Sequence, residues 1–295
     1  MPAGDARAAS ASATDRGPVI VTGASSGIGR ATALRLDSLG FRVLAGVRKD
    51  EDAESLRAAG SGLLEPLMLD VADEESVAAA AEQVAGDVGE AGLAGLVNNA
   101  GIGLGGPVEL LDLDDLRRQL EVNLVGQVAV TQSLIPLLRR AGGRIVFMSS
   151  VGGRLAIPFM SPYHVSKWGL EALADALRVE LSPWGIEVVL IEPGSIATPM
   201  WDKAQGEAAG VIERMDAEGR ALYGEQVAAL QATAVEEAAR GIPPERVAEV
   251  VATALTARRP RTRYLVGRDA KINARVRMLV PDRVFDRLIA RQIGL

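Results

Sequence analysis

The chain has 295 residues, of which 48% are apolar and 24% are charged, and its formal net charge at pH 7 is −6. This apolar content can bury a sizeable core, and α/β chains of this length often form one domain. The absence of cysteine excludes disulfides and thiol nucleophiles, and a single histidine argues against a zinc site, so we expect no metal. No apolar run approaches the roughly 18 residues of a membrane span, so we expect a cytoplasmic protein without integral membrane association.

Two terminal segments stand apart in composition. Residues 1–16 are rich in Ala and Ser, lack the apolar stretch of a signal peptide and predict a disordered tail ahead of a single domain over 17–295. Residues 258–291 contain eleven Arg or Lys and three Asp, so this end carries +8 and the remainder −14. A basic segment over 258–295 could touch nucleic acid or an anionic membrane surface. Because its basic residues are not interleaved with aromatics, we expect it instead to pair with the acidic body or a neighbouring subunit, with no nucleic-acid partner.

Short apolar runs alternate with helical patterns along the chain. Strands are predicted at 18–23, 41–47, 63–71, 93–101, 143–150, 185–194 and 263–267. Helices are predicted at about 28–39, 51–59, 73–86, 113–139, 162–181 and 243–257. This alternation predicts an α/β fold with a doubly wound parallel sheet. Residues 199–240 are rich in Ala, Glu and Gln and follow a strand end, where such sheets bind ligands, so we expect a helical substrate lid there.

The turn after the first predicted strand reads TGASSGIG, residues 22–29. Its glycines, Gly23, Gly27 and Gly29, are spaced G-x-x-x-G-x-G rather than in the common G-x-G-x-x-G dinucleotide pattern. Glycines let the backbone approach a pyrophosphate closely, and the helix that follows offers free N–H groups and a positive dipole end. The turn therefore predicts a nucleotide-phosphate site.

The stretch SPYHVSKWGLEAL, residues 161–173, places a tyrosine, the only histidine and a lysine close together. Tyr163 and Lys167 share one face of the predicted helix, whereas His164 is turned from Tyr163 by about 100°. Proton exchange near pH 7 requires the tyrosine pKa to fall by about 3 units, and one cation at about 4 Å supplies roughly that much. We therefore expect Lys167 to lower the pKa of Tyr163. His164 is expected to be a packing or interface residue, with lining of the substrate entrance as the alternative.

Several motifs occur together and in order between residues 18 and 198. They are the T-G-x-x-x-G-I-G turn, NNAG at 98–101, Asn123, Ser150, Tyr163-x-x-x-Lys167, and PG at 193–194 with Thr198. In this combination the sequence resembles the short-chain dehydrogenase/reductase family. The resemblance implies a Rossmann-type sheet of seven strands and an NAD(P)-dependent enzyme acting on CH–OH or C=O groups. Residues 150–194 are similar to hydroxysteroid and retinol dehydrogenases, and to hydroxybutyrate dehydrogenase relatives.

The resemblance and the chemistry together assign four catalytic residues. Tyr163 exchanges a proton with the substrate oxygen, and Ser150 hydrogen-bonds that oxygen and stabilises its developing charge. Lys167 holds the cofactor ribose, and Asn123 anchors a water that connects Lys167 to solvent. Ser150 is chosen over Ser149 because the family pattern places the serine thirteen residues before the tyrosine.

The cofactor is expected to lie across the strand ends. The expected contacts are Gly23, Ser25, Ser26, Gly27, Ile28, Gly29, Arg48, Asp70, Val71, Asn98, Ala100, Gly101, Tyr163, Lys167, Pro193, Gly194, Ile196 and Thr198. By resemblance, Asp70 and Val71 flank the adenine, Asn98 lies near its ribose, and Ile196 and Thr198 contact the nicotinamide carboxamide.

The choice between the two nicotinamide nucleotides depends on the end of the second strand. An acidic residue there would bind the ribose 2′-OH of NAD, but the sequence has Val47 followed by Arg48 and Lys49. A 2′-phosphate beside Arg48 would gain a charge-assisted hydrogen bond of about 1.5–3 kcal/mol. We therefore expect NADP(H) to be preferred, with NAD(H) possible.

The expected pocket rim is apolar, which favours a hydrophobic secondary alcohol or ketone of steroid-, retinoid- or lipid-like character. Its residues are Ile102, Leu104, Val151, Leu155, Phe159, Met200 and Trp201. One alternative is a 3-oxoacyl carrier-protein reductase whose acidic carrier meets the basic end. An alternative of another class is a non-catalytic nucleotide-sensing binding protein. The resemblance also implies a homodimer or homotetramer formed through the helices at 113–139 and 162–181.

Overall fold

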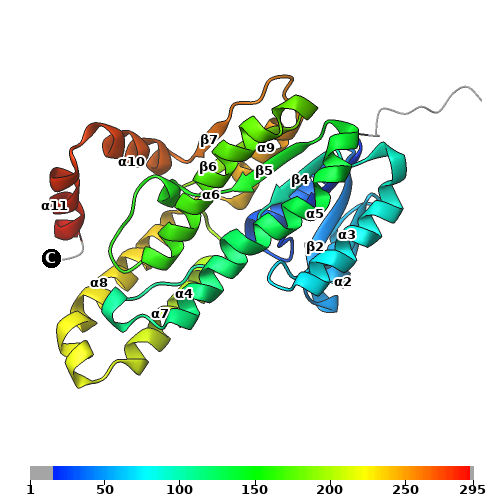
Figure 1. The fold of residues 1–295 in the computed structure, drawn as a ribbon. Helices are drawn as coiled ribbons and strands as arrows, with labels where there is room; N and C mark the ends of the chain where they lie inside the picture. The colour runs from blue at the N-terminus through cyan, green and yellow to red at the C-terminus, as the bar shows by residue number, and fades with distance from the viewer. Residues whose placement is uncertain (1–15, 293–295) are drawn as a thin grey trace, which may run out of the picture.

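The computed structural model describes residues 16–292. Within that range a seven-stranded parallel sheet with the order β3-β2-β1-β4-β5-β6-β7 forms the centre of the molecule (Figure 1). The strands are β1 Pro18–Val21, β2 Arg42–Val47, β3 Leu64–Met68, β4 Gly95–Asn98, β5 Arg144–Met148, β6 Glu187–Pro193 and β7 Arg263–Val266. The strand order reverses between β1 and β4, and ligands bind such sheets beyond the strand ends at this point. The predicted α/β, doubly wound Rossmann-type sheet is confirmed.

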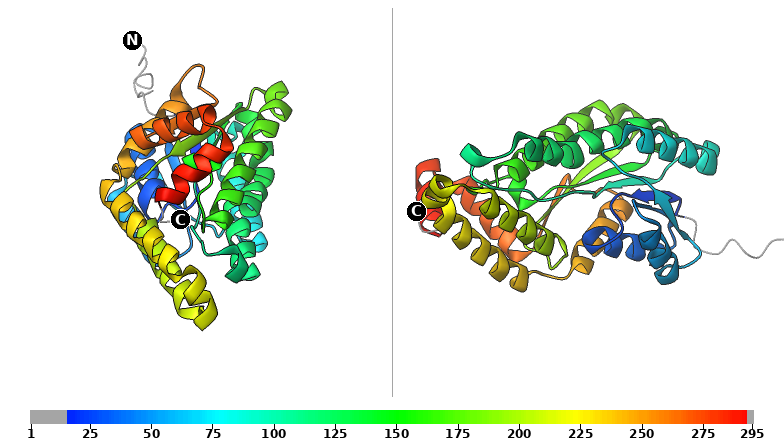
Figure 2. Two further views of the ribbon diagram at one scale, coloured as in Figure 1. Left: turned by 90° about the vertical axis from the view of Figure 1, so that its left-hand side faces the viewer. Right: turned by 90° about the horizontal axis from the view of Figure 1, so that it is seen from below.

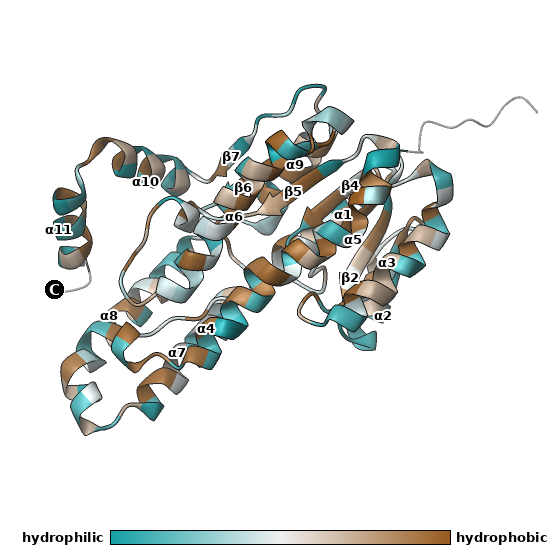
Figure 3. Ribbon diagram, in the orientation of Figure 1, coloured by the Kyte–Doolittle hydropathy of each residue, from teal (hydrophilic) through white to brown (hydrophobic). Residues whose placement is uncertain are grey.

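Helices cover both faces of the sheet, as the view from below shows (Figure 2). One face carries α1 Gly27–Ser38, α2 Asp50–Ala59 and α9 Pro244–Thr256; the other carries α3 Glu74–Val88, α5 Gly126–Ala141 and α6 Ser161–Glu180. Successive strand residues supply opposite cores: Val19 and Val21 pack on the first side, and Ile20 packs on the second. Burial on both faces explains why the strands are nearly all apolar (Figure 3).

The helix predicted over 113–139 is interrupted in the structure. It consists of α4 Leu113–Leu120, a π-helical turn at Glu121–Val125, and α5. A continuous α-helix was therefore the wrong prediction. The widened turn carries Asn123, whose buried side chain hydrogen-bonds the backbone of Ile102 instead of staying on the helix surface. π-turns inside helices are frequent at functional sites.

Residues 200–240 form a pair of helices that projects beyond the sheet, at the lower left of Figure 1. These are α7 Met200–Arg214 and α8 Ala217–Arg240, and Asp216 caps α8 by accepting a hydrogen bond from the Gly219 N–H at 2.7 Å. The buried residues of α8 are Gly219 and Val227, although the helix has 24 residues. Few buried contacts per residue are typical of segments that open at low free-energy cost.

Two helices that the sequence analysis did not predict follow β7, namely α10 Arg268–Leu279 and α11 Asp282–Gln292. In this basic segment, Arg263 forms ion pairs with the acidic body, and Arg277 pairs with Asp282 of the segment itself. Residues 1–15 of the expected disordered tail, 1–16, lie outside the described residues. Its last residue, Arg16, lies over the Phe41 ring at 5.8 Å. Across residues 16–292, no helix is both long enough and apolar enough to cross a bilayer.

Candidate active site

The glycine turn is locked to the neighbouring strand end by two polar side chains. The Thr22 hydroxyl accepts hydrogen bonds from the backbone N–H groups of Asn99 and Ala100 at 2.9 and 3.0 Å. The Asn99 amide donates to the carbonyls of Thr22 and Gly23 at 2.9 and 3.1 Å. A Cβ at Gly29 would lie 2.1 Å from the Gly23 carbonyl oxygen, so no side chain fits at this position. The turn is therefore a fixed part of the crevice in which open α/β sheets bind ligands, beyond the carboxyl ends of the strands.

The start of α1 fits a nucleotide phosphate. Ser26 is the N-cap residue, but its side chain makes no capping hydrogen bond, and the first turn contains no acidic residue. The N–H groups of this turn and the positive end of the helix dipole therefore remain available to an anion. A Cβ at Gly27 would lie 3.2 Å from Thr198 of the loop after β6, so that loop closes over the turn. The predicted contacts Ser25, Ser26 and Ile28 lie here, at the start of α1.

The adenosine end of the predicted site contains an ion pair. Arg48, at the end of β2, lies 3.6 Å from a carboxylate oxygen of Asp70, and both side chains are partly exposed. Val71 is buried beside them. Asn98 has a fully buried side chain, which donates to the Thr131 hydroxyl on α5 at 2.9 Å. Its side-chain nitrogen therefore bonds to the core, and the placement of Asn98 near the adenine ribose stays a prediction.

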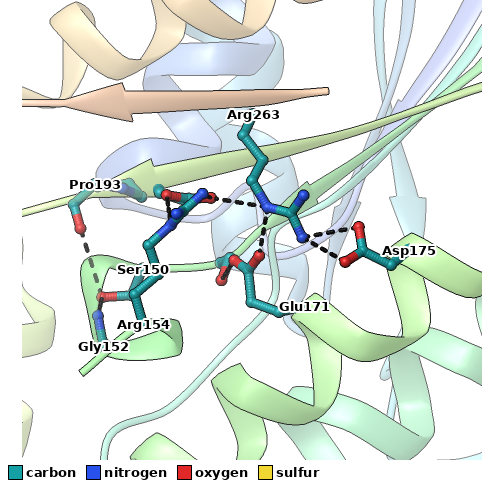
Figure 4. A network of polar contacts seen from close by, with 9 residues as sticks. Ser150, Gly152, Arg154, Glu171, Asp175, Pro193 and Arg263 are labelled. Atoms are coloured by element: carbon teal, nitrogen blue, oxygen red, sulfur yellow. Dashed lines mark hydrogen bonds and ion pairs between the residues drawn. The ribbon is translucent and has the colours of Figure 1, made fainter. Parts of the chain in front are cut away.

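The predicted catalytic side chains lie together where β5 ends and α6 begins. Burial raises the pKa of the Tyr163 phenol, and the Ser150 side chain acts on the phenol to lower it. The Lys167 ammonium lies 5.8 Å from the centre of the Tyr163 ring and donates to the carbonyl of Met148 at 2.8 Å. The Ser150 hydroxyl accepts from the Gly152 N–H at 3.0 Å and lies 3.5 Å from the carbonyl oxygen of Pro193. Figure 4 shows Ser150 between these two partners.

The pKa values of this group differ from the sequence expectation. Burial raises the pKa of Tyr163, and the Ser150 side chain opposes that rise. Burial also lowers the pKa of Lys167 to about 8, while the charge of Glu171 opposes that change. The expected lowering of the tyrosine pKa is therefore not present, because loss of hydration at the phenol outweighs the favourable contacts. Near pH 7 Lys167 stays mostly protonated, so a cation is still available beside the phenol.

Asn123 has its side-chain amide fully committed. Its oxygen accepts from the Ile102 N–H at 2.8 Å, and its nitrogen donates to the Ile102 carbonyl at 2.9 Å and to the Ser166 hydroxyl at 3.2 Å. Gln119 on α4 holds the same segment by donating to the Ile102 carbonyl and accepting from the Leu104 N–H. The two amides therefore fix the chain after NNAG, which borders the substrate side.

His164 is buried and holds the loop after Ser150. Its Nε2 accepts from the Ile157 N–H at 3.2 Å, and its Nδ1 lies 2.9 Å from the Gly152 carbonyl oxygen. Because Nε2 is an acceptor, the neutral ring carries its proton on Nδ1 and donates it to Gly152. His164 is therefore a packing residue, as expected, and in addition both of its ring nitrogens make hydrogen bonds.

The substrate side is enclosed by three segments. Gly106 donates from its N–H to the Phe159 carbonyl at 2.6 Å, and a Cβ at Gly106 would lie 3.4 Å from Val211 of α7. Phe159 has φ +64° and packs edge-on against Tyr223 of α8, with ring centres 6.3 Å apart. Trp201 donates to the Ile196 carbonyl at 2.7 Å, which ties the start of α7 to the loop after β6.

The predicted rim residues differ in exposure. Leu104 and Leu155 are buried, Met200 is 41% exposed, and Ile102, Val151, Phe159 and Trp201 lie between these limits. Each comes from one of the enclosing segments. Over residues 16–292, no group of three or more histidine or carboxylate side chains is placed to hold a metal.

Several polar residues that hold the site together were not predicted from the sequence. They are Thr22, Asn99, Gln119, Gln127, Glu171, Glu192 and Arg263, and all make side-chain hydrogen bonds. The first two lie inside quoted motifs, so the motif itself was the available signal. The last three are partners across different elements and carry no local signal.

Comparison with known proteins defines the class. The model of the short chain dehydrogenase family matches residues 18–209, which is more than half of the chain. The protein therefore belongs to the short-chain dehydrogenase/reductase family and is an NAD(P)-dependent oxidoreductase acting on CH–OH groups.

Individual relatives resemble most of the chain. It is 43% identical to human retinol dehydrogenase 16 over 86% of this chain and 81% of that protein, and 40% identical to mouse retinol dehydrogenase 5 over 92% and 87%. It is 37% identical to the NADPH-dependent 3-dehydrocapnine reductase of Ornithobacterium rhinotracheale over 93% and 96%. A crystal structure of a short-chain dehydrogenase from Streptomyces avermitilis is similar with a TM-score of 0.74 at 27% identity, covering 94% of this chain and 96% of that one.

Proposed function

We propose that the protein is an NADP(H)-dependent oxidoreductase that interconverts hydrophobic secondary alcohols and ketones of steroid-, retinoid- or lipid-like character. The observation that carries the proposal is the placement of Ser150, Tyr163 and Lys167 at one point of the crevice. The names of the relatives support this proposal in two ways. The retinol dehydrogenases favour a hydrophobic substrate, and the human 17-beta-hydroxysteroid dehydrogenase type 6 favours a secondary alcohol.

The three side chains divide the chemistry. Tyr163 donates its phenolic proton to the carbonyl oxygen during reduction and accepts a proton from the hydroxyl during oxidation. Ser150 donates a hydrogen bond to the same oxygen, where charge develops in the transition state. Lys167, protonated below about pH 8, stabilises the phenolate that remains after proton donation. Burial raises the pKa of Tyr163, and the Ser150 side chain opposes that rise, so Ser150 also helps the phenol to act as an acid.

The nicotinamide nucleotide supplies the hydride when bound. The glycine turn and the uncapped start of α1 fit its pyrophosphate, and Arg48 fits a 2′-phosphate. Thr198 and Ile196 belong to the loop that closes over the turn, and we assign them to the nicotinamide side. Asn123 is assigned to the proton path from Lys167, although its side chain is committed to Ile102.

The preference for NADP(H) is tested at Arg48. In the Arg48→Gln variant, kcat/KM with NADPH should fall about 10- to 150-fold, the value of one charge-assisted hydrogen bond, while kcat/KM with NADH should change little. Arg57→Gln, on the exposed side of α2, is the matched control. An equal loss with both nucleotides, or a wild-type preference for NADH, would contradict the assignment.

The substrate class is tested by a panel of carbonyl compounds. The wild-type protein is assayed with NADPH and NADH against aliphatic ketones, 3- and 17-ketosteroids, retinal and acetoacetyl thioesters. The proposal predicts the highest kcat/KM for the large hydrophobic carbonyls. A preference for the acyl thioester would favour the carrier-protein reductase instead, and no turnover of any carbonyl would overturn the proposal.

We also propose that the α7–α8 helices act as a lid over the substrate. Their polar contacts with the body include ion pairs at α4, between Arg118 and Glu207 and between Arg214 and Asp115, and the Trp201 hydrogen bond. Tyr223 of α8 also packs on Phe159 and donates a hydrogen bond to Glu109. Partly exposed ion pairs contribute little stability, so these helices can move at low cost.

A further inference from the structure

A cluster of charged side chains lies next to Ser150, with Arg263 directed at Glu171 and Asp175 (Figure 4). Glu192 of β6 is fully buried, and Glu171 of α6 is 9% exposed. Arg263 of β7, Arg154 of the turn after Ser150, and Asp175 of α6 complete the cluster. Desolvating this many charges is costly unless their contacts are well formed. The contacts within the cluster therefore determine which parts of the chain it holds in place.

Arg263 fixes the two carboxylates on α6. Its Nε donates to Glu171 Oε2 at 2.9 Å, and one Nη donates to both oxygens of Asp175 at 2.8 Å. The same Nε lies 3.3 Å from a Glu192 oxygen. Glu171 is thus held in one orientation by a strand that does not itself reach the crevice.

The other oxygen of Glu171 is directed at the strand end that carries Ser150. The Ser149 hydroxyl donates to Glu171 Oε1 at 2.6 Å, and the Ser149 N–H donates to the Ile191 carbonyl at 2.8 Å. The preceding carbonyl, that of Met148, accepts from Lys167. Residues 148 and 149 are therefore tied to two α6 side chains that lie one turn apart.

The turn after Ser150 packs directly on this pair. A Cβ at Gly153 would lie 2.8 Å from the Ser149 hydroxyl oxygen and 2.9 Å from Glu171 Cγ, so the backbone passes without a gap. One residue later, the Arg154 guanidinium donates two hydrogen bonds to the Glu192 carboxylate. One comes from Nε, and the other comes from Nη2 at 2.8 Å. The segment that carries Ser150 is held on both of its sides by carboxylates that Arg263 contacts.

We propose that Glu171, fixed by Arg263, is a positioning residue for the reaction: it holds Ser149, and with it the strand end that carries Ser150, and its charge sustains the ammonium form of Lys167. This inference rests on the function proposed above. Glu171 touches neither substrate nor cofactor and acts through its two neighbours.

The electrostatic part follows from the pKa of Lys167. Burial lowers that pKa to about 8, and Glu171 is the group that opposes the change. Burial raises the pKa of Glu171, the hydrogen bond from Ser149 lowers it, Glu192 raises it and Arg263 lowers it. The charged groups that face Glu171 from the packed elements are Lys167 and Asp175 of α6, Glu192 of β6, Arg263 of β7 and Arg154 of the turn. Removing the carboxylate charge should therefore lower the pKa of Lys167 further.

The test is a titration of Lys167 by NMR with lysine labelled with ¹³C at the ε carbon. The chain has four lysines, so the spectrum is simple, and the loss of one resonance in Lys167→Arg assigns the signal. The wild-type midpoint is expected near pH 8. In Glu171→Gln the midpoint should fall by about one pH unit, the order expected from one nearby charge. Glu171→Asp, which keeps the charge, should return the midpoint towards the wild-type value.

The matched control is Glu180→Gln, the same change on an exposed position of α6, which should leave the midpoint unchanged. An unchanged midpoint in folded Glu171→Gln would overturn the proposal. If that variant does not fold, Ser149→Ala is tested instead. Its kcat should fall about tenfold, the value of one hydrogen bond, while the KM for NADPH stays unchanged. An unaltered kcat would overturn the proposal. The titration needs no turnover, whereas failure of the proposed function appears as wild-type protein that reduces no carbonyl.

Discussion

His164 makes two hydrogen bonds that require a neutral ring. The Ile157 N–H donates to Nε2, and a protonated imidazole has no acceptor for that bond. Burial lowers the pKa of His164, while the contact of its ring with the Gly152 carbonyl opposes the change. The residue next to Tyr163 therefore holds the loop after Ser150 through a neutral ring.

This neutral ring predicts an acid-dependent loss of stability. The pKa of His164 is about 6.5 in the unfolded chain and lower in the folded one. Between these values the unfolded chain binds a proton that the folded chain does not, so the free energy of unfolding falls as the pH drops below about 6.5. His164→Gln keeps a donor and an acceptor but does not titrate. Urea unfolding at pH 7.5 and 5.5 should show a smaller loss for this variant than for the wild type.

Equal losses in the two proteins would show that the ring is not responsible. Because the chain has one histidine, a single NMR resonance reports its titration directly. That resonance should titrate below pH 6.5 in the folded protein.

At the residue scale the sequence predicted which side chains lie together but not what surrounds them. The motif spacing and the family resemblance pointed to Ser150, Tyr163 and Lys167, and β5 and α6 place these residues together. The direction of the Tyr163 pKa could not be predicted, because it depends on burial by loops distant in sequence. The pairing of Glu171 with Arg263 spans 92 residues, and no local pattern indicates such a contact.

At the scale of elements, the glycine turn has little room for a side chain. Gly29→Ala would place a methyl group 2.1 Å from the Gly23 carbonyl and 2.5 Å from the Asn99 amide. The turn must then shift, which should lower the free energy of unfolding by roughly 1–3 kcal/mol and weaken NADPH binding at least tenfold. Thermal unfolding and fluorescence titration with NADPH measure the two effects.

Gly86→Ala in α3 is the control for that change. A Cβ there meets nothing within 4 Å, and alanine favours a helix, so this variant should be stabilised by about 0.5–1 kcal/mol with unchanged NADPH binding. If Gly29→Ala binds NADPH as tightly as Gly86→Ala, the turn does not hold the phosphate.

The order of elements was predictable because each buried strand leaves a short apolar run between helical patterns. The elements that were not predicted have weaker local signals. α10 and α11 are rich in arginine and have two buried apolar residues, Ala270 and Phe285, in their described part. The π turn at Glu121–Val125 forms because Asn123 bonds the segment around Ile102, a contact made only in the folded chain.

At the scale of the whole molecule, the outer face of α6 predicts self-association. Val165 and Trp168 are 53% and 48% exposed, and Val125 at the start of α5 is 48% exposed. These helices are the ones through which the family resemblance places a dimer contact. We therefore expect a homodimer or homotetramer in solution, formed across this apolar face.

Light scattering of the purified protein tests this expectation. Trp168→Glu should lower the molar mass to that of one chain, since it buries a charge in the contact. Leu222→Glu, on α8 and 54% exposed, is the control and should leave the mass unchanged. A wild-type monomer, or full assembly of Trp168→Glu, would show that the contact lies elsewhere.

The most direct test of the account is Tyr163→Phe, assayed with the best carbonyl substrate of the panel and with NADPH binding measured in parallel. Because the phenol is the proposed proton donor, kcat should fall about 10²- to 10⁴-fold while the Kd for NADPH stays within a few-fold of wild type. Tyr264→Phe, on β7 and away from the crevice, should match the wild type in both measurements. Turnover of Tyr163→Phe at the wild-type rate would contradict the central claim that this tyrosine transfers the proton.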